Sequence, residues 1–201
     1  MKNLLLITLL AGLLTFQVNA QENFSFGVKS GVNLANLSGG GASLDSRTGF
    51  HIGAVAELFL WEDKFAIQPE LIYSQQGAVS NTNLFVEGIS FSIAIKNDYI
   101  NVPVLGKYYP TKGLSLEAGP YFGFNVKSEL EIETMGFEGT EDLNEEVSTF
   151  DFGSVLGVGY ELPIGIFFQA RYMFGVSDIG FADGDEIVRN QLLQFSAGFK
   201  F

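Results

Sequence analysis

From Phe24 to Phe201 the sequence alternates, one residue at a time, between bulky apolar side chains and small or polar ones. The alternation recurs in eight segments, at 24–33, 49–60, 64–76, 99–109, 114–127, 150–161, 165–175 and 191–201. Successive residues of a β-strand point to opposite faces, so each segment is predicted to be a strand with one apolar and one polar face. Each is close to, or longer than, the roughly 9–11 residues that a tilted strand needs to cross a bilayer.

The links between these segments alternate in length. Short turns at 61–64, 110–113 and 163–165 take their places between long links at 35–47, 78–98, 128–148 and 177–190. An up-and-down barrel with both termini on one side has tight turns on that side and long loops on the other. A sandwich with Greek-key connections gives no reason for this regularity. We therefore predict an all-β fold, an eight-stranded antiparallel up-and-down transmembrane β-barrel.

The apolar face of each predicted strand is expected to be the outer one. The chain has 20 Phe and 7 Tyr, and the apolar faces are too bulky to fill the inside of eight strands. The opposite faces carry Gly, Ser, Gln and charged groups, so the arrangement suits a hydrocarbon solvent outside and a polar lumen inside. Aromatic residues near strand ends are predicted to form interfacial girdles: Trp61, Tyr73, Tyr108, Tyr109, Tyr121, Tyr160 and Tyr172.

The first 20 residues have the pattern of a secretory signal peptide. Lys2 precedes an apolar run from Leu4 to Phe16, and small residues lead to a cleavage site after Ala20. The run is shorter than the roughly 20 residues of a membrane-spanning helix. Residues 1–20 are thus predicted to be a signal peptide and residues 21–201 a barrel domain. The absence of cysteine excludes disulfides and lipid attachment through an N-terminal cysteine.

The chain is acidic, which makes a nucleic-acid partner a poor prediction. Its formal net charge is −12, and removal of Lys2, the only charged residue in 1–20, leaves −13. Nucleic-acid binding requires a basic face to neutralise phosphates. The 128–148 link has no basic residue and eight acidic ones, namely Glu129, Glu131, Glu133, Glu138, Glu141, Asp142, Glu145 and Glu146.

Two departures from regular strands are expected. Pro69 lies on the apolar face within 64–76 and has no N–H to donate, so it predicts a bulge or a local gap in the ladder. Residues 84–96 also alternate, but in the opposite register to 99–109, which predicts a bulge near 96–98. With a turn at Glu87-Gly88, this segment is interpreted as a hairpin arm beyond the membrane.

The inward faces gather a polar set with charges of both signs. It could line a path for protons or solutes, or it could fill a narrow lumen with ion pairs and hydrogen bonds. Eight strands leave an interior just wide enough for side chains, which favours the filled lumen. Because buried charges need partners, Glu70 or Glu117 is expected to pair with Lys107 or Arg171. The predicted lumen residues are Lys29, His51, Glu57, Gln68, Glu70, Asn101, Lys107, Glu117, Asp151, Glu161 and Arg171.

No catalytic, cofactor or metal site is predicted. His51 is the only histidine, so it can build no multi-histidine metal site, and it is expected to form hydrogen bonds in the lumen. The acidic stretch 183–186 (DGDE) has oxygen ligands that suit Ca²⁺, but it lacks the longer EF-hand pattern, and a turn is the preferred interpretation. The run GGGA at 39–42 has no lysine or helix after it with which to bind phosphate.

Several segments, in order along the chain, resemble the PorT-like outer-membrane β-barrel family. They are GFHIGAVAELFL, FAIQPELIYSQQG, DYINVPVLGKYYP, LEAGPYFGFNV, FDFGSVLGVGYEL and the final aromatic strand. The resemblance implies an eight-stranded barrel in a Gram-negative outer membrane. The branch that gives the family its name takes part in protein export by the type IX secretion machinery. The terminal Phe201 also resembles the C-terminal signal that the outer-membrane assembly machinery reads.

The sequence thus predicts a non-enzymatic integral protein of the cell outer membrane with both termini in the periplasm. We expect it to anchor or support a cell-surface or protein-secretion assembly through its long loops. Its expected partners are outer-membrane lipid, the assembly machinery and a protein at those loops. The alternative is a narrow channel for small solutes. A lipid-modifying or proteolytic enzyme lacks an identifiable catalytic set, and a soluble lipocalin-like carrier would need a polar exterior.

Overall fold

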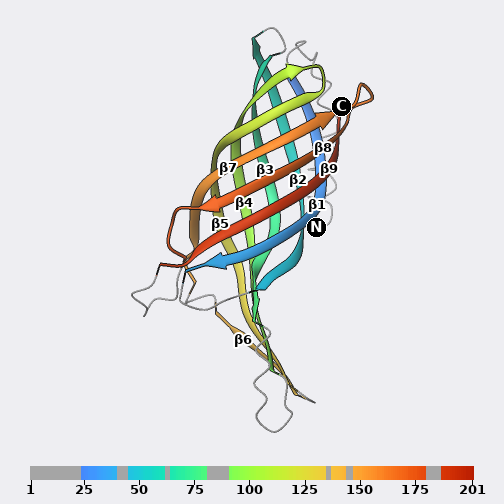
Figure 1. The fold of residues 1–201 in the computed structure, drawn as a ribbon. Helices are drawn as coiled ribbons and strands as arrows, with labels where there is room; N and C mark the ends of the chain where they lie inside the picture. Colours follow the sequence, from blue (N-terminus) through green and yellow to red (C-terminus); the bar gives the residue numbers. More distant parts are fainter. Residues whose placement is uncertain are drawn as a thin grey trace, which may run out of the picture.

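The strands of this protein close into a barrel that continues, on one side, into a long projection (Figure 1). A computed structural model describes residues 24–39, 45–61, 64–80, 91–134, 137–143, 147–179 and 187–201. The strands are β1 Phe24–Ser38, β2 Asp45–Trp61, β3 Phe65–Ser80, β4 Phe91–Thr111, β5 Leu114–Thr134, β6 Phe137–Asp142, β7 Phe150–Glu161, β8 Ile166–Gly175 and β9 Arg189–Lys200.

Eight of these strands form the barrel. Along the ring, β1 pairs with β2, β2 with β3, β3 with β4, β4 with β5, β5 with β7, β7 with β8 and β8 with β9. All these pairings are antiparallel. The pairing of β1 with β9 closes the ring. The short β6 pairs with β5 and stands outside the ring. The predicted eight-stranded antiparallel up-and-down barrel is therefore confirmed. No helix in the described ranges is long and apolar enough to cross a membrane.

The alternation of the sequence matches the two faces of the barrel wall. Odd-numbered side chains of β1, such as Lys29 and Asn33, are buried inside, whereas Phe26 and Val28 are exposed outside. The exposed large hydrophobic residues continue around the barrel, with Ile52 on β2, Leu71 on β3 and Phe168 on β8 among them. The barrel is thus apolar outside and polar inside, as a lipid environment requires.

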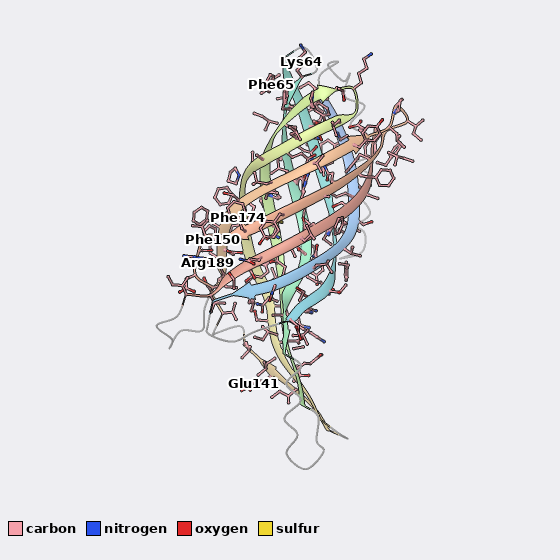
Figure 2. All side chains as sticks on the ribbon, in the orientation of Figure 1. Lys64, Phe65, Glu141, Phe150, Phe174 and Arg189 are labelled. Carbon is pink, nitrogen blue, oxygen red and sulfur yellow. The ribbon has the colours of Figure 1, made fainter. Side chains whose placement is uncertain are left out.

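The short turns, the start of β1 and the end of β9 lie at one end of the barrel, here called the short-turn rim. Backbone hydrogen bonds at this rim join Tyr109 to Lys64, Glu161 to Gly113, Lys200 to Gly165, and Phe26 to Phe201. Gly113 and Gly165 have φ angles of 84° and 85°, a left-handed conformation that glycine adopts without strain. Figure 2 shows Lys64 and Phe65 at this rim and Glu141 at the far end of the molecule.

The projection is built from extensions of barrel strands, which corrects two sequence-based interpretations. β4 and β5 are 21 residues long each, and residues 91–98 continue β4 instead of forming a separate hairpin. The acidic 128–148 link is also partly strand, because 128–134 belong to β5 and β6 pairs with it. The turn expected at Glu87-Gly88 lies outside the described residues. We call 91–98 of β4, 127–134 of β5 and all of β6 the projecting sheet.

The predicted bulge lies next to its expected position but on the neighbouring strand. Asp98 pairs with Lys127 and Tyr99 with Asn125, so β5 carries the extra residue, Val126. β4 therefore keeps one register, and Asn97 lies on the same buried inner face as Tyr99. The prediction that β4 itself changes register is wrong, because the apolar Ile95 turns inward and packs against a buried cluster.

Pro69 produces a gap in the ladder and no bulge. The pairing of β2 with β3 is interrupted between Val55↔Glu70 and Leu58↔Ile67, yet the register is the same on both sides. The missing N–H of proline explains an interruption without an inserted residue.

Two predicted girdle residues are inside the barrel. Tyr109 and Tyr121 are buried among lumen side chains, whereas Tyr108, Tyr160 and Tyr172 are exposed on the outer face. Their positions along the strands explain why they are not girdle residues. Odd-numbered residues of this part of β4 and β5, such as 109 and 121, lie on the inward face. The side chain of Trp61 lies outside the described residues.

A lysine on the outer face tests the apolar exterior. Leu156, in the middle of β7, is 55% exposed, and Ile164, in a turn at the short-turn rim, is 66% exposed. Lysine costs about 2–4 kcal/mol at the bilayer midplane and about 0–1 kcal/mol near its surface. We expect Leu156→Lys to lower the free energy of unfolding by about 2–4 kcal/mol, and Ile164→Lys by less than about 1 kcal/mol. Urea titrations in phospholipid vesicles, followed by tryptophan fluorescence, measure both. Equal small effects would contradict a lipid-facing wall.

Candidate functional site

The lumen next to the short-turn rim is organised around Glu57. Its carboxylate pairs with Lys107 at 3.1 Å and with Lys200, and it accepts a hydrogen bond from the hydroxyl of Tyr109. Lys200 also pairs with Glu161, with 2.6 Å between Nζ and Oε2. Lys200 was absent from the predicted site, although its strand parity placed it on the inward face.

The middle of the lumen is organised around Arg171. Its guanidinium donates two hydrogen bonds of 2.8 Å to Glu70 and one of 2.7 Å to Glu117. Lys29 pairs with the same Glu70 carboxylate at 2.8 Å. Lys107 reaches Glu117 at 3.4 Å and thereby connects this layer to Glu57.

Two amides complete this network. Gln68 accepts a 3.0 Å hydrogen bond from Lys107 and donates one to Glu70. Gln169 donates a 3.1 Å hydrogen bond to Glu117. Four cationic side chains and four carboxylates thus form one chain of contacts: Lys29, Lys107, Arg171 and Lys200 with Glu57, Glu70, Glu117 and Glu161. Pairing of this kind offsets the large cost of removing charges from water.

His51 occupies a neutral hydrogen-bonded layer farther along the lumen. Its Nδ1 lies 2.7 Å from Asn33 Oδ1, and its Nε2 lies 2.8 Å from Ser196 Oγ. The Asn33 oxygen can only accept, so Nδ1 carries the proton and Ser196 donates to Nε2. The nitrogen of Asn33 donates to Ser74 and to the backbone oxygen of Gln75, which fixes the orientation of the amide.

This layer has the contact order of a serine, histidine and amide triad, but no room for a substrate. His51 is 0% exposed, and Ser196 is buried beside it. A Cβ added to Gly31, on the adjacent strand, would lie 2.7 Å from His51 Cε1 and 2.8 Å from Ser196 Cα. Gly31 therefore packs directly against His51 and the backbone of Ser196, and this side of the pair is closed. The arrangement supports hydrogen bonding within the lumen instead of nucleophilic catalysis.

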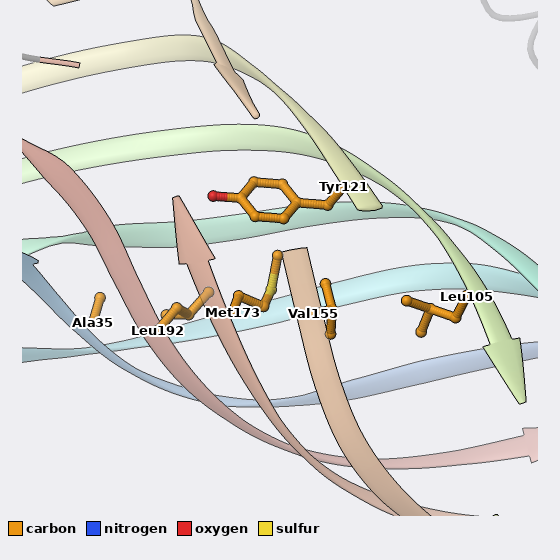
Figure 3. Close-up of a cluster of buried hydrophobic side chains, with 6 residues drawn as sticks. All are labelled: Ala35, Leu105, Tyr121, Val155, Met173 and Leu192. Atoms are coloured by element: carbon orange, nitrogen blue, oxygen red, sulfur yellow. The ribbon is translucent and has the colours of Figure 1, made fainter. Parts of the chain in front are cut away.

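An apolar cluster crosses the lumen beyond the charged layers. Figure 3 shows its six members, one from each of six strands: Ala35, Leu105, Tyr121, Val155, Met173 and Leu192. We call it the apolar plug. Its members come from six of the eight barrel strands, with none from β2 or β3.

A second polar group lies next to the plug. Asp151 accepts hydrogen bonds of 2.9 Å from the Tyr121 hydroxyl and from Asn190 Nδ2, and another from Ser177 Oγ. Asn101 is buried on β4 with its Oδ1 beside Gly123. All eleven predicted lumen residues therefore lie on the inner side of the barrel wall. Eight belong to the ion-pair chain and its amides, His51 lies in the neutral layer, and Asp151 and Asn101 lie apart from both.

Metal ligands do not gather in the described part of the chain. No group of three histidine, aspartate or glutamate side chains there is arranged to hold a metal ion. The 183–186 stretch, considered above for Ca²⁺, lies outside the described residues, as do residues 40–42 of the GGGA run.

Removal of Arg171 tests the ion-pair chain. Arg171→Met leaves Glu70 and Glu117 with one lysine each, and breaking a buried pair costs about 3–5 kcal/mol. We expect that loss in urea titrations, and partial recovery in R171M/E117Q, which keeps Glu70 paired with Lys29 and Lys107 paired with Glu57. The matched control is Lys127→Met, because Lys127 pairs with Glu129 at 2.8 Å on the exposed projecting sheet and should cost less than about 1 kcal/mol. Equal costs for the two single variants would contradict a tightly coupled lumen.

Comparison with known proteins supports the same architecture. Neisserial surface protein A (NspA) superposes with a TM-score of 0.55 at 16% identity, over 90% of this chain and 100% of that chain. Ail of Yersinia pestis gives a TM-score of 0.49 at 14% identity, over 90% of this chain and 100% of that one. At 16% identity the likeness to NspA shows the fold alone. No curated protein sequence matches the chain.

The family comparison is more specific. The sequence profile described as "Outer membrane protein beta-barrel domain" matches residues 19–180, which is most of the chain. It agrees with the closed ring of strands, the apolar exterior and the polar interior, and it gives the protein an integral position in the outer membrane. The chain therefore belongs to the outer membrane protein beta-barrel domain family.

Proposed function

We propose that this protein is a non-enzymatic outer-membrane barrel that supports a cell-surface or protein-secretion assembly through its projecting sheet. The observation that carries the proposal is the contrast between the two parts of the molecule. The lumen holds the ion-pair chain and the apolar plug, whereas β5 continues past the end of β7 and is flanked there by β4 and β6, with β3 beside β4 as far as Ile93. β7 pairs with β5 only as far as Phe124, so the residues of β5 from 126 to 134 extend beyond it.

The projecting sheet is suited to binding a basic protein surface. Glu129 and Glu131 on β5 are partly exposed, and Glu141 on β6 is exposed. Lys96 and Lys127 each pair with one glutamate of β5, and they leave an excess of negative charge in this region. Acidic surfaces accelerate association with basic partners and help to select them. A role in protein export, as in the PorT-like branch, is the form of this proposal that the sequence resemblance favours.

The orientation of the chain is part of the proposal. Outer-membrane barrels have short periplasmic turns and longer extracellular loops. The short-turn rim also holds the described start of β1 and the end of the chain, where Phe201 N donates a 2.8 Å hydrogen bond to Phe26 O. We therefore infer a signal peptide at 1–20, both termini in the periplasm, and Phe201 as the recognition residue for the assembly machinery. The projecting sheet then faces the cell exterior.

A site-specific crosslinker tests the projecting sheet. Thr140 on β6 and Thr111 at the short-turn rim are both exposed and share one residue type, so they form a matched pair. We expect a photoreactive amino acid at 140, but not at 111, to give a discrete protein adduct in native outer membrane. The variant E129Q/E131Q/E141Q should lower the yield of that adduct. No adduct at 140, or the same adducts at both positions, would contradict the proposal.

Conductance distinguishes this function from a channel. Eight strands leave an interior only just wide enough for side chains, and the ion-pair chain lies within it, so the purified protein should give no unitary current in planar bilayers in which a porin does. Steady, voltage-independent current steps from the wild-type chain would replace the proposed function with solute transport.

A further inference from the structure

One edge of the projecting sheet, along β6, has no neighbouring strand among the described ones. β6 pairs with β5 and stands last in the strand order of the sheet (Figure 1). Its ladder with β5 runs over six residue pairs without a register shift. β7 does not reach this level, because its pairing with β5 ends at Phe124↔Phe150. The side of β6 that faces away from β5 is therefore an open sheet edge.

One backbone hydrogen bond identifies the groups of β6 that lie on this edge. Leu143 N donates a 3.0 Å hydrogen bond to Ser128 O, in continuation of the β5–β6 ladder. In an antiparallel ladder, pairs that exchange hydrogen bonds alternate with pairs whose N–H and C=O groups point away from each other. Counted from Leu143, positions 141 and 139 are hydrogen-bonded to β5. The N–H and C=O groups on the open edge are thus those of residues 138, 140 and 142.

Negative charge is the feature of β6 that limits what can pair at this edge. Natural edge strands are blocked by proline, by bulges or by charged side chains. The sequence of β6, FEGTED, has no proline and its ladder has no bulge, but three of its six residues are acidic. Like charges opposite each other on two strands destabilise the pair, and opposite charges stabilise it. The edge therefore disfavours a second copy of β6 and favours a basic strand.

We propose that β6 binds an extended basic segment of a partner protein as one more strand of the projecting sheet. This inference rests on the proposed function and specifies how the partner is held. Main-chain hydrogen bonds to residues 138, 140 and 142 supply the affinity, as they do wherever a peptide adds to a sheet edge. Lysine or arginine side chains of the segment lie near the acidic residues of β6, of which Glu141 is exposed. The segment is thus selected by its charge and by its ability to extend.

Hydrogen exchange of the protein alone tests whether the edge is open. In nuclear magnetic resonance spectra of the barrel in phospholipid nanodiscs, we expect the amides of residues 139 and 141 to be protected by β5. The amides of 138, 140 and 142 should exchange about tenfold faster or more. Protection of residue 140 in the protein alone would mean that another part of the chain already occupies the edge, and it would overturn the proposal.

Peptide binding tests the occupant. The probe is a fluorescent decapeptide of alternating lysine and threonine. One control alternates glutamate and threonine, and the other is the corresponding oligomer of N-substituted glycines, which has the charge of the probe but no amide N–H. In fluorescence anisotropy with the folded protein in a non-ionic detergent, the probe should bind about tenfold more tightly than either control. Its binding should also protect the amide of Thr140.

A proline at position 140 tests the backbone contact from the side of the protein. Thr140→Pro removes one N–H from the open edge and keeps the ladder with β5, because the N–H of residue 140 points away from β5. We expect it to weaken binding of the probe about tenfold. Thr140→Val, which keeps the N–H, is the matched control and should change the affinity less than about twofold. Continued protection of residues 139 and 141 shows that β6 is still formed in both variants.

Several outcomes would overturn strand addition. They are equal affinity for the probe and either control, equal binding by T140P and the wild type, and the same loss in T140V as in T140P. A complex of two chains in which residue 140 is protected would identify the edge as a self-association surface instead. If crosslinking at 140 in native outer membrane gives its discrete adduct while any of these outcomes holds, the proposed function stands and only strand addition fails.

Discussion

Closure of the strand ring by β1 and β9 is the constraint on which the rest of this structure depends. A sheet in hydrocarbon cannot leave backbone N–H and C=O groups unpaired, so the first and last barrel strands must meet. Eight strands then fix a lumen only as wide as its side chains. Glycine provides the space that large lumen residues need. A Cβ at Gly157 would lie 2.6 Å from Arg171 Cγ, and a Cβ at Gly153 would lie 2.7 Å from the ring of Tyr121. The glycine-rich inner face of β7 therefore accommodates the central arginine and the tyrosine of the plug.

A lumen of fixed width also determines how its charges are arranged. Arg171 cannot reach bulk water, so it needs both Glu70 and Glu117, and each glutamate needs a lysine as well. The resulting chain of ion pairs is balanced in sign, and removal of one member leaves a buried charge without full compensation. The apolar plug packs next to these layers in the same lumen. Rigidity of this kind suits a scaffold more than a conduit, because a conduit would require the charges to separate.

Much of this architecture could be predicted from the odd or even position of each residue in its strand. A two-residue period identifies the inward face of each strand, so the sequence placed Glu57, Glu70 and Arg171 inside the barrel and expected a glutamate to pair with Arg171. Partner identities beyond that depend on the stagger between strands, which no single strand encodes. Lys200 shows this, since its parity was visible but its contact with Glu57 requires β9 and β2 to be near each other across β1.

Other features escaped prediction because local pattern and tertiary pairing disagree. The bulge was assigned to β4 because Ile95 and Ile100 differ in parity, but Ile95 is inward and packs in a buried cluster, and the extra residue is Val126 on β5. Residues 84–96 were interpreted as a strand of a separate hairpin arm, and only the acidic 128–148 link was interpreted as loop, although 128–134 continue β5. A strand outside a bilayer no longer needs an apolar exterior, so its sequence loses the signal that identifies the barrel strands.

Because side chains occupy the interior of the barrel, contacts with other molecules form at its outer surfaces. The outer wall meets a solvent of hydrocarbon, and most of it needs only bulk and apolarity. The projecting sheet departs from that uniform wall, because acidic side chains replace apolar ones there. A barrel whose buried charges are paired within the lumen can thus present a polar sheet at one end without a contact there disturbing those ion pairs.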